Sequence, residues 1–354
     1  MVRSPINPPA NLGEPTQNPR SAAEVVELAK AAAESLLAEL DCGAQATSNW
    51  ADEELGFALV QTALDRCLSR LAETDFWGQA NRAPSNALWA VAGNLLIKGS
   101  LQARARTKPR GYAGDFEMFV QFDEWRCEGD ALGKLFDRYF QNQAAVEAVR
   151  SRTRQIAGAL TCHSLARGLE SSGGPPYRVV SIGCGPALDI ELAVRWLPEP
   201  LRRRLSVTLL DLDGDAVEHA IGRLRSVLFD DQLAGFRDNL YRLADRPKSN
   251  ALAENADFLV CSGLFDYLPD AAAVKLLRWC WGRLSPRGTL LVGNFAPHNP
   301  SRAYMEWIGN WYLLYRTPAD LARLAEQAGI PRWAIQIGAE RLGIDLFLCA
   351  ENNV

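Results

Sequence analysis

A short strand, a glycine turn and a helix start form the feature of this sequence that most constrains its fold. Residues 177–191 read Tyr-Arg-Val-Val-Ser-Ile-Gly-Cys-Gly-Pro-Ala-Leu-Asp-Ile-Glu. The apolar, β-branched run predicts a buried strand, and Gly183 and Gly185 stand where the backbone must turn sharply and lie close to a ligand. A helix that begins near Pro186 would direct free N–H groups and a positive dipole end at that ligand.

A second predicted strand, residues 205–210, ends in two carboxylates, Asp211 and Asp213. In an open α/β sheet, ligands bind in the crevice at the carboxyl ends of the strands, where an acid can accept hydrogen bonds from ribose hydroxyls. A Gly-x-Gly after a strand also occurs in ordinary turns. With the acid beside it, the turn indicates a nucleotide ligand, either a dinucleotide or S-adenosylmethionine.

Strands and helices alternate after residue 176, which predicts a parallel, doubly wound α/β sheet. The segment 170–176 (Glu-Ser-Ser-Gly-Gly-Pro-Pro) has the composition of a linker, so we expect a domain over 177–354. Its expected strands are 177–182, 205–211, 240–243, 256–262 and 288–295, closed by an antiparallel pair at 333–338 and 344–350. Its expected helices are 187–196, 215–229, 271–284 and 317–328.

The first part of the chain predicts helices. Residues 1–20 carry five prolines and should form an extended arm. Ser21 and Glu24 form a capping box for a helix that reaches about residue 40, and further helices are expected at 52–72, 85–98 and 135–165. A helical domain over 21–170 follows. Three arginines of its last helix are expected to be solvated, and an aromatic stripe on a predicted helix before residue 317 is expected to pack between the domains or to line an apolar substrate channel. The arginines are Arg150, Arg152 and Arg154; the stripe is Trp307, Trp311, Tyr312 and Tyr315.

Composition favours a small-molecule partner. The 354 residues are 48% hydrophobic and 23% charged, with a net charge of −4, which gives no support to binding of nucleic acid or of an anionic membrane. The eight cysteines include no Cys-x-x-Cys pair, and we expect them to be reduced, buried and mostly structural. The N-terminus has no apolar core of signal-peptide length and no segment reaches about 18 apolar residues, so we expect a cytoplasmic protein. The oligomeric state is left open, a homodimer included.

The order of elements and the motifs resemble the class I S-adenosylmethionine-dependent methyltransferases over residues 177–352. This resemblance implies a Rossmann-like, mostly parallel, seven-stranded sheet covered by a helical N-terminal lid. It also implies roles for matching residues. The first motif, with Ser181, Gly183, Cys184 and Gly185, would lie against the amino-acid part of S-adenosylmethionine, and Asp211 with Leu212 would lie at the ribose. Asp238 and Asn239 would lie near the adenine, and Ser262 near the sulfonium. Ala187 stands in the place of the family's third glycine.

A second stretch narrows the resemblance. Residues 110–115 (Arg-Gly-Tyr-Ala-Gly-Asp), with the long helical extension, resemble a bacterial subfamily that includes methyltransferases associated with hydroxy-fatty-acid methyl esters. The same architecture is similar to azetidine-2-carboxylate synthases, which cyclise S-adenosylmethionine and release methylthioadenosine. The resemblance implies that Tyr112 and Asp115 reach the cofactor from the helical domain.

Candidates for catalytic roles follow the strand ends and the glycine-flanked loop: Tyr112, Ser262, Asp266, Tyr267 and His298. Aromatic faces such as that of Tyr112 can stabilise a sulfonium by about 0.5–2 kcal/mol. In the alternative reading, Asp266 caps the following helix and Tyr267 packs in the core with its hydroxyl satisfied. No histidine spacing predicts a metal site.

Four hypotheses follow for the activity. The first is methyl transfer from S-adenosylmethionine to a small molecule or acyl chain, in secondary metabolism. The second is the intramolecular cyclase, in which the α-amine of S-adenosylmethionine attacks its own γ-carbon. The third, a nicotinamide oxidoreductase, is disfavoured because Asp211 follows Gly183 by 28 residues, more than the roughly 20 of the dinucleotide fingerprint. The fourth is a catalytically silent nucleotide-binding module.

Overall fold

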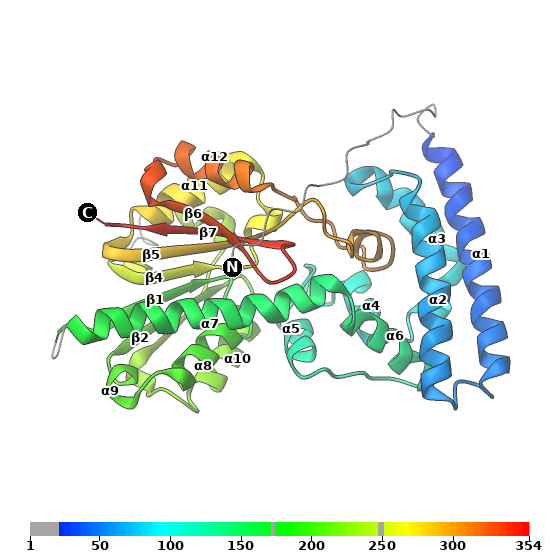
Figure 1. Ribbon diagram of the computed structural model, residues 1–354, viewed down its shortest axis with the longest axis horizontal. Coiled ribbons are helices and arrows are strands. Elements are labelled where there is room, and N and C mark those ends of the chain that lie inside the picture. The colour runs from blue at the N-terminus through cyan, green and yellow to red at the C-terminus, as the bar shows by residue number, and fades with distance from the viewer. Residues whose placement is uncertain (1–20, 171–173, 247–250, 354) are drawn as a thin grey trace, which may run out of the picture.

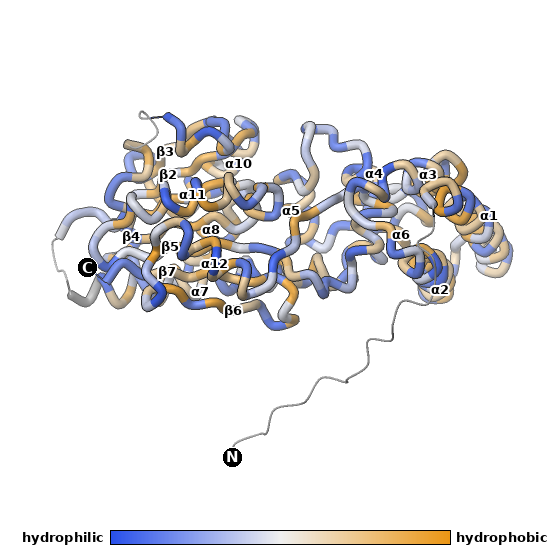
Figure 2. The backbone as a smooth tube through the Cα atoms, turned by 90° about the horizontal axis from the view of Figure 1, so that it is seen from above, coloured by the Kyte–Doolittle hydropathy of each residue, from blue (hydrophilic) through white to orange (hydrophobic). Residues whose placement is uncertain are grey.

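A computed structural model describes residues 21–170, 174–246 and 251–353 (Figure 1). The predicted arm, residues 1–20, lies outside the described residues, as does the middle of the predicted linker, residues 171–173. The molecule is elongated, with a sheet region and a helical region that follow one another along the long axis. Helix α5 (Phe116–Asp123) lies between them (Figures 1 and 2).

The sheet confirms the predicted α/β class. Its seven described strands lie in the order β3-β2-β1-β4-β5-β7-β6. All neighbouring pairs are parallel except those of β7 with β5 and with β6, which are antiparallel. The strands are β1 (Tyr177–Ile182), β2 (Leu205–Asp211), β3 (Leu233–Arg237), β4 (Ala256–Cys261), β5 (Leu284–Phe295), β6 (Ile335–Ala339) and β7 (Asp345–Glu351).

Helices cover both faces of this sheet (Figure 1). Because successive side chains of a strand point to opposite faces, Val179 packs in the core beneath α7, α8 and α10, and Val180 packs in the core beneath α11 and α12. The covering helices are α7 (Ala144–Glu170), α8 (Leu188–Trp196) and α10 (Gly214–Leu224) on one face, and α11 (Asp270–Trp281) and α12 (Pro318–Gln327) on the other. The short α9 (Glu199–Arg202), η2 (Asp230–Gln232) and η7 (Arg332–Ala334) lie in connections.

The helical region precedes the sheet in the chain. Its elements are α1 (Ala22–Ala46), α2 (Glu53–Ala72), η1 (Gly78–Asn81), α3 (Arg82–Leu96), α4 (Ser100–Thr107), α5 and α6 (Ala131–Gln141), and α7 runs from it along the sheet (Figure 1). The predicted capping box is confirmed: the Glu24 N–H donates to Ser21 Oγ and the Ser21 N–H donates to Glu24 Oε2, at 3.3 and 2.6 Å.

A segment that follows β5 joins the two regions. Residues 296–316 cross from the sheet into the helical region and contribute Tyr304, Trp307 and Trp311 to its core. Trp307 is fully buried, and its carbonyl accepts a hydrogen bond of 3.0 Å from Ser85 Oγ of α3. The aromatic stripe therefore packs between the regions. The predicted helix is confirmed only in part. Residues 302–308 are helical, with the π-helical turn η6 (Tyr304–Ile308), but residues 310–316, which carry Trp311, Tyr312 and Tyr315, are not.

Two further predictions need correction. Residues 240–243 are not a strand but part of the 3₁₀ helix η3 (Leu240–Asp245), because the side chain of Asn239 accepts the Tyr241 N–H at 3.1 Å and favours a turn there. Arg150 and Arg152 are buried rather than solvated, and only Arg154 is exposed. Arg150 packs 3.5 Å from the Trp125 ring and donates 2.9 Å to the carbonyl of Phe122.

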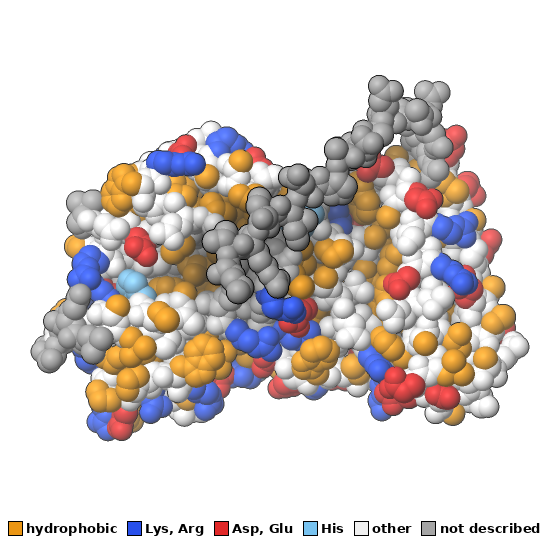
Figure 3. All heavy atoms as spheres, viewed as in Figure 1, with side chains coloured by type: hydrophobic (Ala, Val, Ile, Leu, Met, Phe, Trp, Pro, Cys, Tyr) orange, Lys and Arg blue, Asp and Glu red, His pale blue; other side chains and the backbone are white. Residues whose placement is uncertain are grey.

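The eight cysteines are free thiols. The expectation that all are buried is wrong for Cys42 and Cys162, which are exposed, whereas the rest are at least half-buried. No described helix is both long and apolar enough to cross a bilayer. On the face drawn in Figure 3, basic and acidic side chains are interspersed over both regions.

Candidate active site

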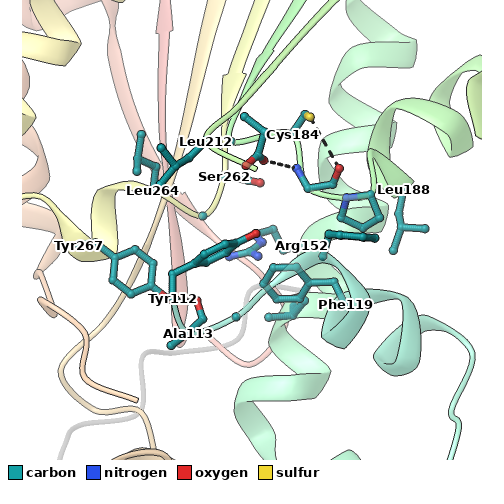
Figure 4. Close-up of a pocket in the computed structure, with 18 of the residues that line it drawn as sticks. Tyr112, Ala113, Phe119, Arg152, Cys184, Leu188, Leu212, Ser262, Leu264 and Tyr267 are labelled. Atoms are coloured by element: carbon teal, nitrogen blue, oxygen red, sulfur yellow. Dashed lines mark hydrogen bonds between the residues drawn. The ribbon is translucent and has the colours of Figure 1, made fainter. Parts of the chain in front are cut away.

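A cavity of about 330 Å³ lies where the carboxyl ends of β1, β2 and β4 meet the helical region. The sheet contributes the glycine turn after β1, Asp211 at the end of β2 with Leu212 directly after it, and Ser262 after β4 (Figure 4). The other wall comes from the loop at 111–114, from α5 and from α7. This is the crevice in which doubly wound sheets bind ligands, and its volume suits a small molecule.

The turn after β1 has the backbone that the sequence predicts. Gly183 and Gly185 adopt φ of +66° and +49°. A Cβ on Gly183 would come no closer than 3.7 Å to a neighbour, so the left-handed conformation, not lack of space, favours glycine there. Ala187 also has a left-handed φ, of +53°, directly before α8. For an alanine this conformation costs roughly 1–2 kcal/mol, so backbone strain is held at the edge of the cavity.

Asp211 fixes this turn to the next strand. Its Oδ2 accepts the Gly185 N–H at 2.9 Å and its Oδ1 accepts the Asp213 N–H at 3.0 Å (Figure 4). The side chain is 7% exposed. Burial raises the pKa of this carboxyl, opposed by the N–H groups of Asp213 and Gly185. The carboxylate is thus oriented before any ligand arrives and retains lone pairs toward the cavity.

The loop at 110–115 is tied across the cavity to the residues after β2. The Tyr112 hydroxyl donates to Asp213 Oδ2 at 3.3 Å. Arg110 pairs with Asp213 and Asp215 at 2.9 and 2.8 Å. Burial, reinforced by the negative charges of Asp211 and Asp213, raises the pKa of Tyr112, so its phenol stays protonated at neutral pH. These contacts hold the Tyr112 ring within the cavity.

Tyr267 connects three segments through its hydroxyl. It accepts the Trp311 Nε1–H at 2.7 Å and donates to the carbonyl of Ala113 at 3.3 Å. Burial, with the charge of Asp266 next, raises its pKa, so the phenol is a neutral donor and acceptor rather than a ready base. Tyr267 lines the cavity from the turn after β4, with Ser262 and Leu264 (Figure 4).

Arg152 is the functional candidate that the sequence interpretation missed. It is 6% exposed and lines the cavity from α7, where its Nη1 lies 3.0 Å from Oδ2 of the fully buried Asp345 of β7. Burial raises the pKa of Asp345, and the Arg152 guanidinium opposes that rise. The sequence did hold a signal, because Val149, Arg152 and Ile156 fall on one helical face and all three line the cavity.

The structure thus brings about half of the predicted site residues to the cavity. Those that line it are Tyr112, Gly183, Cys184, Gly185, Asp211, Leu212, Ser262 and Tyr267. Those that do not are Asp115, Ser181, Asp238, Asn239, Asp266 and His298. The functional roles given to all of these residues stay predictions.

The residues that lie off the cavity have other contacts. Asp115 caps α5 through the Met118 N–H and pairs with Arg104 at 2.8 Å. Asp266 does not cap α11; its Oδ1 accepts the Phe295 N–H at 2.7 Å and its carbonyl accepts the Leu314 N–H. Ser181 is buried within β1, and Asn239 caps η3.

Asp238 pairs with Arg246, and His298 is exposed in the loop after β5. Within the described ranges, no group of three or more His, Cys, Asp and Glu side chains is arranged to hold a metal ion.

The chain shares its fold with solved structures but matches no family model, and no curated protein matches it significantly. A possible exported protein from Bordetella parapertussis is 18% identical, with a TM-score of 0.55 over 95% of this chain and 98% of that one. The S-adenosylmethionine-dependent methyltransferase SibL is 16% identical, with a TM-score of 0.45 over 94% of this chain and 99% of its own. Magnesium protoporphyrin IX methyltransferase from Synechocystis PCC 6803 is 19% identical, with a TM-score of 0.43 over 66% and 94%. At such identities the likeness is one of fold.

The two glycines of the loop give a matched test of how the cavity wall is held. Gly111 and Gly114 both have positive φ, +85° and +69°, but a Cβ on Gly114 would lie 2.6 Å from the Trp311 ring and a Cβ on Gly111 would meet nothing within 4 Å. We expect Gly114→Ala to lower the melting temperature and displace Tyr112. Gly111→Ala should cost only the backbone strain of about 1–2 kcal/mol. Thermal unfolding of the two variants measures the difference, and equal melting temperatures would contradict the packing described.

Proposed function

We propose that the protein is an S-adenosylmethionine-dependent methyltransferase that acts on a small-molecule or acyl-chain acceptor. The observation that carries this proposal is Asp211, a buried carboxylate at the end of β2 that is hydrogen-bonded to the glycine turn after β1 beside a small cavity. A carboxylate in that place suits two ribose hydroxyls. The antiparallel β7 and the long interval between Gly183 and Asp211 weigh against a nicotinamide coenzyme.

The lining residues fit the parts of S-adenosylmethionine. Asp211 would accept hydrogen bonds from the ribose, and the apolar Leu212 and Leu240 with the Tyr241 ring would contact the adenine. Arg152 supplies a guanidinium for the carboxylate of the methionine part. The Tyr112 ring presents an aromatic face to a cation in the cavity. The carboxylate thus matches the ribose and the apolar wall matches the adenine. The guanidinium matches the carboxylate of the methionine part, and the aromatic face matches the sulfonium.

The chemistry asks little of the protein beyond positioning. The sulfonium supplies an activated methyl: the lone pair of the acceptor forms a bond to the methyl carbon while the carbon–sulfur bond breaks and its electron pair returns to sulfur. The protein must align the acceptor and exclude water. The loop at 110–115, held by Tyr112 and Tyr267, closes the cavity on the side of the helical region, which would act as the lid.

The test is to titrate the purified protein with S-adenosylmethionine by calorimetry and to follow products by mass spectrometry. We expect binding, with S-adenosylhomocysteine formed only when an acceptor is added. Methylthioadenosine formed from S-adenosylmethionine alone would replace the proposal with the intramolecular cyclase. Binding of a nicotinamide dinucleotide in place of S-adenosylmethionine would replace it with an oxidoreductase.

Asp211 should control affinity in a pH-dependent way. We expect Asp211→Asn to bind S-adenosylmethionine about tenfold or more weakly, because a hydrogen bond to a charged group contributes about 1.5–3 kcal/mol. Burial raises the pKa of Asp211, and the charged form is the better acceptor. Wild-type affinity should therefore be full above that pKa and fall as the pH is lowered through it, over a pH range that lies above the usual one for an aspartate carboxyl.

Calorimetry across that range measures the effect. The same carboxyl-to-amide change at the exposed Asp231 is the control. An Asp211→Asn variant that kept both the affinity and the pH dependence of the wild type would refute the ribose assignment.

Arg152 and Asp345 form a buried ion pair, and substitutions of the two residues should differ in their effect on ligand affinity. Arg152→Gln removes the guanidinium from the cavity, whereas Asp345→Asn breaks the same ion pair but leaves the guanidinium in place. Both should lower the melting temperature, since disrupting a buried pair costs about 3–5 kcal/mol. Only Arg152→Gln should weaken S-adenosylmethionine binding, by about tenfold. Equal losses of affinity in the two folded variants would show that Arg152 acts only through stability.

A further inference from the structure

Part of the cavity lining is not used by the cofactor assignment. It includes Arg82 at the start of α3, Lys108 after α4 and Tyr312 of the segment that joins the two regions. Tyr312 is more than 200 positions from both Arg82 and Lys108 in the chain. We call this set the cationic end.

The positive charges of the cationic end have no carboxylate partner among the described residues. The Arg82 guanidinium stacks 5.3 Å from the centre of the Tyr312 ring. No ion pair joins Arg82 or Lys108 to an acid among the described residues. A third cation, Arg106, stands close by and donates to neutral groups, at 2.7 Å to Ser85 and 2.5 Å to Asn86. Two positive charges therefore line the cavity here, and the charge of Arg106 acts on one of them, Lys108.

Most other charged groups near the cavity have partners, but the carboxylates of Asp189 and Asp211 also line it and have no ion-pair partner among the described residues. Arg152 pairs with Asp345, and Asp123 faces Arg150, whose own partner is Glu147 at 3.5 Å. Glu306, whose charge acts on Tyr312, pairs with Arg302 at 2.8 Å and accepts the Gly78 N–H. The cationic end is thus the part of the cavity lining that has an excess of positive charge.

Its residues are suited to an oxyanion. Half-burial, then the charges of Arg82 and Arg106, lowers the pKa of Lys108, so a bound anion would relieve a repulsion that the protein now carries. The buried hydroxyl of Tyr312 makes no hydrogen bond of full geometry in the described residues. Burial raises its pKa, opposed by the nearby Ser85 hydroxyl, so it is a protonated donor. A guanidinium, an ammonium and a phenol together bind carboxylate or phosphate oxygens.

Apolar and aromatic groups make up much of the remaining lining. Tyr112, Phe116, Phe119 and Tyr267 are among them, and such side chains contact the carbon body of a ligand. A ligand with its anionic group at the cationic end would therefore extend its body toward Ser262 and the glycine turn.

We infer that the methyl acceptor carries an anionic oxygen group, a carboxylate or a phosphate, that Arg82, Lys108 and Tyr312 bind, with its apolar body directed toward Ser262. This inference rests on the proposed function, because it takes the Asp211 end as the place of the methyl donor. It names the class of acceptor as a small acid with an apolar or aromatic body.

The test compares three probes of one shape: 3-phenylpropionate, its neutral primary amide, and 3-phenylpropyl phosphate. Binding to the full chain is measured by calorimetry, with and without S-adenosylhomocysteine. We expect at least one acid to bind about tenfold or more tightly than the amide. The tighter of the two acids identifies the anionic group. The inference would be overturned if the amide bound as tightly as both acids, or if neither acid bound.

Variants locate the effect. Arg82→Gln combined with Lys108→Gln should remove about tenfold or more of the affinity for the acid and leave that for S-adenosylmethionine within about twofold. The matched control removes two exposed charges of the same helical region, Arg66→Gln with Lys134→Gln, and should change neither affinity.

The outcomes separate the two proposals. Loss of S-adenosylmethionine affinity in the Arg82 and Lys108 variant would show that these cations bind the methyl donor. That result would overturn the inference, while the proposed function would stand. A wild-type protein that binds no S-adenosylmethionine but still prefers the acids to the amide, with that preference lost in the variant, would overturn the proposed function alone. Melting temperatures of all variants show whether each is folded.

Discussion

The hydrogen bond from the Gly185 N–H to Asp211 Oδ2 is the contact on which the site depends. It joins the turn after β1 to the end of β2, and the Gly183 and Cys184 N–H groups add two bonds to the carbonyl of Leu210. The left-handed glycines make this close approach possible, and the buried carboxylate keeps it in one arrangement. From this anchor the contacts continue through Asp213 to Tyr112 and Arg110, so the sheet edge orients the loop that covers it.

Local patterns in the sequence predicted what local physics determines. The β-branched run before Gly183, the carboxylate after β2, the caps at Ser21 and Thr317 and the antiparallel closing pair were all legible, because each depends on neighbouring residues or on a period of two. The strand at 233–237 was not. It is a half-buried edge strand, and Gly235, which reads as a turn signal, is small there because Val217 and Ile221 of α10 lie against it.

The missing parts of the site depend on contacts between distant residues. Arg152 looks like one of three arginines on a solvated helix until β7 places Asp345 against it. Arg82, Lys108 and Tyr312 carry no shared motif and meet only because the segment after β5 enters the helical region. Asp266 follows the strand that supplies Ser262, yet its carboxylate accepts the Phe295 N–H inside the structure. Position at a strand end predicts where a residue lies but not which way its side chain turns.

The crossing segment also changes how the chain divides. The linker composition at 170–176 suggests two units that fold in turn, but the core of the helical region includes Tyr304 and Trp307, and Tyr304 donates its hydroxyl to the buried Gln102 at 2.9 Å. Contacts between residues some two hundred positions apart form at a cost in the conformational entropy of the chain between them. The first half emerging from a ribosome would therefore expose an incomplete apolar core until residues beyond 300 are made, and helical region and sheet reach their native packing as one cooperative unit.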